Sequence, residues 1–203
     1  MIYDLEKRKD PYQSLDDEVE SLNKTIYLAR HCEAVGQAAE AGLTGAGVVQ
    51  AEGLAELLSG TGIGRIVSSP FVRAVESIEP LARRLGVGIE LDERLIEAAL
   101  STVDHPDWLA KLRDTFSDFE LAFEGGESSQ AATTRGIAAV KDALALGTDP
   151  IAVVTHGRLL TLILKHFDPK YGFEEWQALK TPDVFRVEVS DEQAAVSKCV
   201  RVV

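Results

Sequence analysis

The sequence contains little cysteine, few basic residues relative to acidic ones, and no long apolar run. Its 203 residues include two cysteines far apart, Cys32 and Cys199, so we expect neither a disulfide framework nor a cysteine-based zinc site. Thirty-three acidic against 21 basic residues give a net charge of −12, which leaves no basic surplus for displacing the counterions of a nucleic acid. No apolar run approaches the ~20 residues that span a bilayer, and the N-terminus lacks the apolar segment of a signal peptide. We therefore expect a cytoplasmic protein that binds neither nucleic acid nor membrane.

What is present is typical of one globular domain. Hydrophobic residues make up 45% of the chain and charged residues 27%, and 203 residues suffice for a single α/β core. Residues 1–24 are polar and charged, and we interpret them as an N-terminal arm or surface extension. The folded domain is predicted to cover residues 25–203.

Apolar runs alternate with segments of helical periodicity along this domain. Strands are predicted at residues 25–29, 63–67, 89–91, 151–155, 184–189 and 196–203. Helices are predicted at about 46–59, 71–85, 128–146 and 159–166, with a helical excursion at 98–126. Pro80 is expected to bend or break the second of these helices. The alternation predicts a three-layer α/β/α sandwich, in which a mainly parallel sheet ends in an antiparallel edge formed by the last two strands.

Three of the predicted strands end in residues that suit an anion. The first ends in Arg30-His31, the second in residues 68–70 with Arg73 one turn further on, and the 151–155 strand in His156. The carboxyl ends of parallel strands share one edge of a sheet, where ligands collect. Two guanidinium groups and two imidazoles at one edge indicate a phosphate site with a nitrogen nucleophile.

These residues belong to a longer ordered pattern. In chain order the blocks are Arg30-His31, Leu43-Thr44-x-x-Gly47-x-x-Gln50-Ala51, Ser68-Ser69-Pro70-x-x-Arg73-Ala74, Gly126-Glu127-Ser128 and Thr155-His156-Gly157. Their order and intervals resemble those of the histidine phosphatase superfamily, also called the phosphoglycerate-mutase-like family, from about residue 25 to residue 189. The resemblance implies a three-layer α/β fold and a phosphoryl-transfer site that needs no metal and no cofactor. Residues 25–203 would then be the catalytic domain, with 98–126 as a small helical lid insertion.

The resemblance also implies roles for individual residues. His31 would be the nucleophile that forms a phosphohistidine. Arg30 and Arg73 would bind the non-bridging phosphoryl oxygens, and His156 would donate a further hydrogen bond to them, a role that favours its protonated form. Glu97, in a Leu-x-Glu pattern, matches the position of the proton donor.

Several positions leave alternatives open. Asp92 and Glu93 compete with Glu97 for the role of proton donor, and Glu127 and Ser128 serve either the site or the cap of a helix. Gln37 stands where the family often has a phosphate-binding asparagine, so we expect it to contact phosphate. Arg158 either adds charge at the rim of the site or caps a helix. Cys32 replaces the usual glycine, as a tolerated small residue or as a side chain that crowds the nucleophile.

The sequence favours hydrolysis of a small phosphorylated metabolite. Phosphoglycerate mutases of the family carry long basic segments after the proton donor, whereas residues 98–126 are acidic and disfavour a second anionic group on the substrate. A phosphoglycerate-type phosphomutase and a non-catalytic module that binds a phospho-ligand or a protein are the alternatives. A protein phosphohistidine phosphatase would need an open, shallow site, which the presence of 98–126 disfavours. The substrate and the oligomeric state are left open.

Overall fold

The computed structural model describes residues 23–190 and 194–199. The predicted arm at residues 1–24 therefore lies almost entirely outside the described residues, as does the end of the strand predicted at 196–203. Within the described ranges, no helix is long and apolar enough to cross a membrane.

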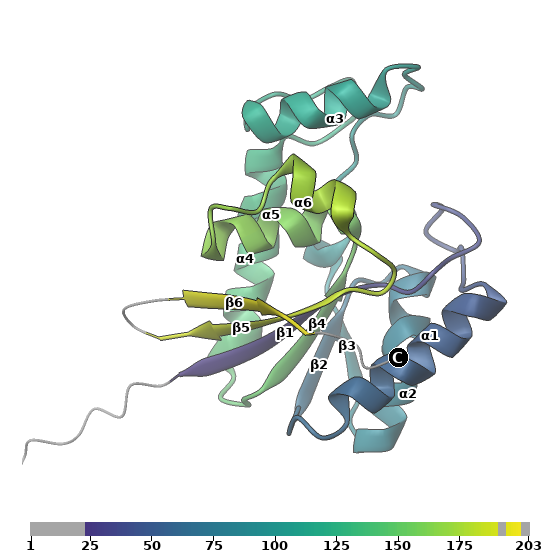
Figure 1. Ribbon diagram of the computed structural model, residues 1–203, viewed down its shortest axis with the longest axis vertical. Helices are drawn as coiled ribbons and strands as arrows, with labels where there is room; N and C mark the ends of the chain where they lie inside the picture. Colours follow the sequence, from purple (N-terminus) through teal and green to yellow (C-terminus); the bar gives the residue numbers. More distant parts are fainter. Residues whose placement is uncertain (1–22, 191–193, 200–203) are drawn as a thin grey trace, which may run out of the picture.

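A six-stranded sheet forms the centre of the molecule (Figure 1). Its strands are β1 (Lys24–Arg30), β2 (Arg65–Ser68), β3 (Ile89–Leu91), β4 (Ile151–Thr155), β5 (Val184–Val189) and β6 (Ala194–Lys198). They lie in the order β3-β2-β4-β1-β5-β6; the first four are parallel, and β5 pairs antiparallel with both β1 and β6. The mainly parallel sheet with an antiparallel edge is confirmed.

Helices cover both faces of the sheet and complete three layers (Figure 1). The helices α1 (Gly45–Leu58) and α2 (Val72–Leu85) pack on one face, and α4 (Ser129–Ala145) and α5 (Gly157–Phe167) on the other. Strand β1 shows the reason for this arrangement, because its side chains alternate between the two faces. Ile26 and Leu28 enter the core with α4 and α5, while Tyr27 and Ala29 enter the core with α1 and α2.

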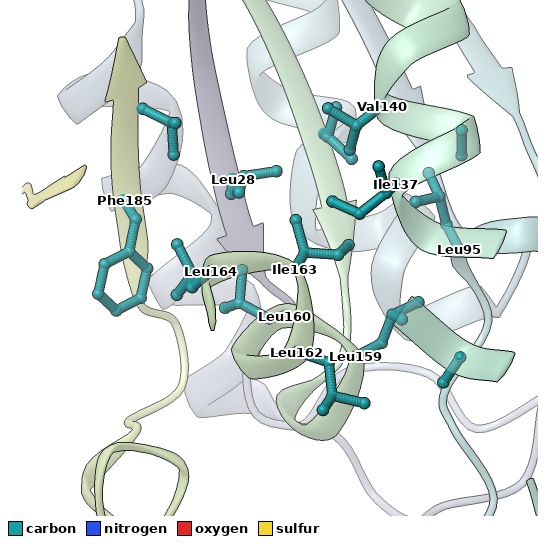
Figure 2. Close-up of a cluster of buried hydrophobic side chains, with 14 of the residues drawn as sticks. Leu28, Leu95, Ile137, Val140, Leu159, Leu160, Leu162, Ile163, Leu164 and Phe185 are labelled. Carbon is teal, nitrogen blue, oxygen red and sulfur yellow. The ribbon is translucent and has the colours of Figure 1, made fainter. Parts of the chain in front are cut away.

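The core under α4 and α5 fixes the start of α5 against the sheet. Figure 2 shows Leu160, Ile163 and Leu164 of α5 beside Leu28 of β1, in one core cluster with Ile137 and Val140 of α4. Residues 159–164 of α5 are completely buried, so this helix has almost no freedom to shift relative to β4, which precedes it. The residues at the β4–α5 junction are thereby held in place.

The expected break at Pro80 does not occur. Helix α2 runs from Val72 to Leu85 as one element with Pro80 inside it. Pro80 is itself buried, and its neighbours Ile78 and Leu81 are fully buried in the core that α2 shares with α1. Packing of the apolar face therefore outweighs the loss of one backbone donor.

Two small helices stand beyond the carboxyl edge of the sheet. Helix α3 (Trp108–Ser117) is the only α-helix described within the predicted excursion at 98–126, and the short η1 (Glu93–Leu95) precedes that excursion. Helix α3 packs against α6 (Phe173–Ala178), which the sequence analysis did not predict (Figure 1). The rings of Trp108 and Trp176 meet edge to face, with centroids 6.4 Å apart.

Candidate active site

The ends of β1, β2 and β4 meet as predicted. The backbone N–H of His31 donates to the carbonyl of Thr155 at 3.0 Å, and that of Ser69 donates to the carbonyl of Val154 at 2.9 Å. These bonds extend the sheet pairing by one residue and bring the His31 and His156 rings to a centroid distance of 5.1 Å, edge to face. The sheet itself therefore builds the centre of the site.

His31 has hydrogen-bond partners that fix its tautomer. Its Nδ1 lies 2.7 Å from the carbonyl oxygen of Cys32, which only accepts, so Nδ1 carries the proton. Arg73 Nε donates to Nε2 of His31 at 3.2 Å, so Nε2 presents its lone pair. Burial and then the charges of Arg73 and Arg30 lower the pKa of His31 to about 4, against the opposing effect of the Cys32 bond. His31 is therefore neutral near pH 7, as a nucleophile requires.

Arg73 links the nucleophile to the loop that follows β1. It is 1% exposed, and its Nη1 donates to the carbonyls of Gln37 at 3.1 Å and Ala38 at 2.8 Å. Burial lowers the pKa of Arg73, with the charge of Glu97 opposing, and a guanidinium remains protonated despite such a shift. The structure thus places Arg73 and the backbone of Gln37 beside His31; contact of the Gln37 side chain with phosphate stays a prediction.

Arg30 supplies a half-buried cation whose hydrogen bonds are incomplete. Its Nη1 donates to the carbonyl of Leu179 at 3.2 Å, and its buried Nε has no hydrogen-bond partner in the described part of the chain. A Cβ on Gly157 would lie 3.4 Å from the guanidinium carbon, so glycine allows Arg30 to lie against the start of α5. Burial lowers the pKa of Arg30 and the Glu97 and Asp183 charges oppose it. A buried donor of this kind fits an anionic ligand.

His156 is completely buried at the end of β4. Its Nε2 lies 2.7 Å from Ser69 Oγ, and its Nδ1 has no hydrogen-bond partner among the described residues. Burial and the neighbouring His31, Arg73, Arg135 and Arg30 lower its pKa to about 2. The surrounding residues by themselves therefore hold His156 neutral, and the protonated form expected from the sequence requires the negative charge of a bound phosphate.

Glu97 lies at the amino end of α5, close enough to interact electrostatically with Arg30 and Arg73. Its Oε1 accepts from the backbone N–H groups of Leu159 at 3.1 Å and Ala98 at 2.9 Å, and Oε2 accepts from that of Arg158 at 3.2 Å. These bonds hold the carboxyl group of Glu97 at the amino end of the helix. Its charge acts on both Arg30 and Arg73. These two arginines, with His31 and His156, are called the phosphate clamp below.

The two competing carboxylates are engaged elsewhere or exposed. Asp92 accepts from the backbone N–H of Arg94 at 2.8 Å and forms an ion pair with its guanidinium at 2.7 Å. Glu93 begins η1 with an exposed side chain. The geometry favours Glu97 over both as the proton donor.

Arg158 is neither a rim charge nor a simple cap. It is 3% exposed, and its Nη1 donates to the carbonyls of Ala98 at 3.3 Å and Ala99 at 3.1 Å. Its Nη2 donates to the carbonyl of Glu127 at 3.1 Å and to Ser129 Oγ at 3.3 Å. The backbone N–H of Arg158 also donates to the carboxylate of Glu97. Arg158 therefore ties the segment that follows Glu97 to α5 and to the start of α4.

The Gly126-Glu127-Ser128 block has a structural role. Ser128 caps α4 and accepts from the backbone N–H of Ala131 at 3.1 Å. Glu127 forms a two-pronged ion pair with Arg135 at 2.8 and 2.7 Å, and Arg135 Nη1 also donates to the carbonyls of Arg94 and Ile96 at 2.6 and 2.9 Å. The hydrogen bonds of these residues cap α4 and support the Glu97 segment; a role of Glu127 or Ser128 in the site stays an open alternative. Sequence reasoning missed Arg135.

Cys32 packs into the protein interior. It is completely buried and belongs to the core shared with α1 and α2. Its backbone N–H donates to Ser77 Oγ at 2.7 Å, and Ser77 Oγ in turn donates to the carbonyl of Arg73 at 2.6 Å. A small side chain at this position is therefore accommodated, and the backbone around it joins β1 to α2.

Together these residues provide a nitrogen nucleophile, cationic donors for an anion and a carboxyl group. A pocket of about 760 Å³ opens next to them and shares Gln37 and Glu97 with the site. Among the residues the structure describes, no group of three or more histidine, cysteine, aspartate or glutamate side chains is placed to hold a metal ion. The donors present suit phosphoryl transfer.

Comparison with known proteins agrees with this geometry. The family profile of the histidine phosphatase superfamily (branch 1) matches residues 26–200. A mycobacterial glucosyl-3-phosphoglycerate phosphatase has the same fold, with a TM-score of 0.70 at 23% identity over 88% of this chain and 98% of the other. Phosphoserine phosphatase from Entamoeba histolytica gives a TM-score of 0.72 at 17% identity, over 88% of this chain and 98% of the other.

A mutase shares the fold as well. Phosphoglycerate mutase from Bacillus anthracis gives a TM-score of 0.68 at 19% identity, over 88% of this chain and 93% of the other. A search of curated protein sequences finds no match. The family match covers most of the chain, and it supports phosphatase activity. The chain belongs to the histidine phosphatase superfamily, branch 1.

Proposed function

We propose that this protein is a metal-independent phosphomonoesterase that works through a phosphohistidine on His31. The observation that carries the proposal is the fixed tautomer of His31: Nδ1 donates to the carbonyl of Cys32 at 2.7 Å, and Nε2 carries the lone pair beside Arg73. A neutral imidazole held in this way needs no general base for its attack on phosphorus.

In the first step, Nε2 of His31 attacks the phosphorus and the ester P–O bond breaks. Glu97, as the carboxylic acid, gives its proton to the departing alcohol oxygen and becomes a carboxylate. Arg30, Arg73 and His156, with Gln37, hold the non-bridging oxygens, whose negative charge they stabilise in the transition state. The products of this step are the free alcohol and phosphohistidine.

In the second step, water attacks the phosphorus of phosphohistidine. The Glu97 carboxylate accepts a proton from that water, the P–N bond breaks, and the electron pair returns to Nε2 of His31. Inorganic phosphate leaves, and both residues regain their starting protonation. The three backbone N–H groups that bind Glu97 keep its carboxyl group in one orientation through the cycle.

Hydrolysis is favoured over the two alternatives by the charge and completeness of the site. A mutase must hold the carboxylate of its substrate. The pocket beside Glu97 contains the carboxylates of Glu97 and Asp104, which repel such a group. Its arginine, Arg158, is already hydrogen-bonded to backbone carbonyls. A non-catalytic module has no need for the assembled His31, Arg73 and Glu97. We further propose a small phosphorylated metabolite as substrate, from the presence and acidity of residues 98–126, and the cytoplasm as location, from composition.

The proposal is tested by turnover of 4-nitrophenyl phosphate with a chelator present. We expect the unmodified protein to hydrolyse it, and His31→Ala to lose activity by about 10⁴-fold or more, as for other covalent nucleophiles. His166→Ala is the matched control, because His166 lies exposed at the end of α5. Activity retained in His31→Ala would refute the nucleophile, and a rate abolished by the chelator would refute metal independence.

A further inference from the structure

The pocket next to the phosphate clamp is far larger than a phosphate group. Its volume of about 760 Å³ falls within the ~300–1,000 Å³ typical of sites for small organic ligands. Gln37 and Glu97 form part of its wall, so the pocket begins where the proton donor meets the leaving oxygen. In the proposed reaction, this is the space for the alcohol part of the ester.

The wall of this pocket is mainly apolar. Its apolar side chains include Leu100, Val103, Pro106, Trp108, Leu112 and Trp176. Trp108 is 50% exposed and Val103 is 45% exposed, although side chains of this kind are normally buried. Exposed apolar side chains gathered around a pocket mark a site for an apolar ligand.

The charged side chains of the wall do not favour an anion. Glu97 and Asp104 are acidic, and Arg158 is the only arginine in the described part of the wall, which contains no lysine. The guanidinium of Arg158 is 3% exposed and already donates to the carbonyls of Ala98, Ala99 and Glu127. His105, the remaining titratable group, is hydrogen-bonded through Nε2 to Ser101 Oγ at 3.2 Å.

We propose that the substrate is the phosphate monoester of an apolar, ring-sized alcohol that carries no second anionic group. The inference rests on the proposed phosphatase function and adds its substrate class. Trp108 and Trp176, whose rings meet at 84°, would contact the ring of the alcohol, and Asp104 would repel a carboxylate or a second phosphate.

The test compares kcat/KM of the unmodified protein for two matched pairs of aryl phosphates. 2-Naphthyl phosphate against phenyl phosphate varies the apolar size, and 4-carbamoylphenyl phosphate against 4-carboxyphenyl phosphate varies the charge at nearly constant shape. We expect the naphthyl ester and the carbamoyl ester each to be favoured by about tenfold, equivalent to 1.4 kcal/mol. Because no substitution is involved, misfolding of a variant does not affect this comparison.

Two variants assign the preferences to the pocket. Asp104→Lys should raise the rate for the carboxyl ester relative to the carbamoyl ester by about tenfold. Asp114→Lys is the control, because Asp114 is exposed on α3 and does not line the pocket, so the charge ratio should stay as in the unmodified protein. Trp176→Ala should lower the naphthyl-to-phenyl ratio.

The outcomes separate the two proposals. If no aryl phosphate is hydrolysed, the proposed phosphatase function fails, and the substrate class fails with it. If the esters are hydrolysed but the carboxyl ester is preferred, or the naphthyl ester gains nothing, the phosphatase function stands and the substrate class is overturned.

Discussion

The phosphate clamp and the pocket beside it are built in different ways. The clamp lies at the ends of β1, β2 and β4, where buried groups bind one another at hydrogen-bond distance, as His31 does with Cys32 and Arg73. The pocket is lined by the segment 98–108, α3 and α6, and half-exposed Trp108 belongs to its wall. A sheet edge positions reacting groups rigidly, whereas a connecting segment can vary without disturbing them. In the proposed function, chemistry is therefore a property of the clamp, and substrate choice a property of the pocket.

Apart from loss of His31, the largest effect on the chemical step is expected for the proton donor. Glu97→Gln should lower kcat about 10²–10⁴-fold for an alkyl phosphate, because the poor leaving group then departs without a proton. The first step with 4-nitrophenyl phosphate, whose leaving group needs no proton, should slow far less. Glu93→Gln is the matched control and should leave both rates unchanged. Equal losses in the rate of the first step for the two esters would contradict the role of Glu97 as acid.

Loss of Arg73 should break the clamp at its link to the nucleophile. Arg73→Ala should reduce kcat by about 10²–10³, as removal of one transition-state donor does elsewhere. Arg73→Lys should not restore activity, since one ammonium cannot replace the fork that reaches His31, Gln37 and Ala38 together. Steady-state kinetics on both variants checks this, and full activity in the lysine variant would show that charge alone suffices.

Arg158 joins the two regions, and its substitution should affect both stability and rate. Arg158→Met leaves the carbonyls of Ala98 and Ala99 without their donor, which should cost about 2–4 kcal/mol of unfolding free energy. Because the segment that follows Glu97 is then no longer held, Glu97 should be displaced, and kcat for alkyl phosphates should fall about tenfold to a hundredfold. Urea unfolding and kinetics measure the two effects, with surface Arg83→Met as the control.

A purely structural role of Arg158 would lower stability only. The double variant with Glu97→Gln separates the two cases, because a residue that acts through Glu97 has no further effect on kcat once that carboxyl group is gone. Additive losses of kcat in the double variant would contradict the positioning role.

The smallest effect concerns pH. Because the pKa of His31 is lowered to about 4, its ring should stay neutral from pH 8 down to pH 5. An ordinary histidine, with a pKa near 6.5, would become protonated within this range. Nitrogen NMR of the ring, assigned with His31→Ala, measures this directly. A midpoint near 6.5 would contradict the buried, neutral nucleophile.

The same shift has a consequence for stability. Between about pH 6.5 and pH 4 the unfolded chain binds a proton at His31 that the folded chain does not, so the free energy of unfolding should fall as the pH falls through this window. Urea unfolding at a series of pH values measures the slope, which His31→Ala should reduce.

The clamp could be predicted from the sequence because strand ends and local motifs define it. Arg30, His31 and His156 directly follow or end apolar runs, and parallel strands bring such ends together. The supporting contacts could not be predicted in this way. Arg158 reaches carbonyls 59 and 60 residues away, and no local pattern specifies such a bond. Ser69 belongs to one of the motifs in the sequence, yet its hydrogen bond to His156 joins residues 87 positions apart and could not be predicted from that motif.

The pocket was predicted least well, for a physical reason. Helix α6 has only six residues, Phe173–Ala178, too few for a clear helical period, and packing against α3 holds it in place. The contact between Trp108 and Trp176 joins segments that are distant in sequence. The acidic character of residues 98–126 was visible in the sequence, but the apolar wall that accompanies it needed the fold.

In the proposed mechanism His31 carries the phosphoryl group, and a rapid-quench experiment detects that group on the protein. The protein is mixed with 4-nitrophenyl phosphate, quenched in alkali, in which phosphohistidine survives, and analysed by peptide mass spectrometry. We expect an acid-labile phosphoryl group on the peptide containing His31, more of it in Glu97→Gln, and none in His31→Ala. Turnover without any phosphorylated His31, at a rate that His31→Ala preserves, would contradict a phosphohistidine intermediate on His31.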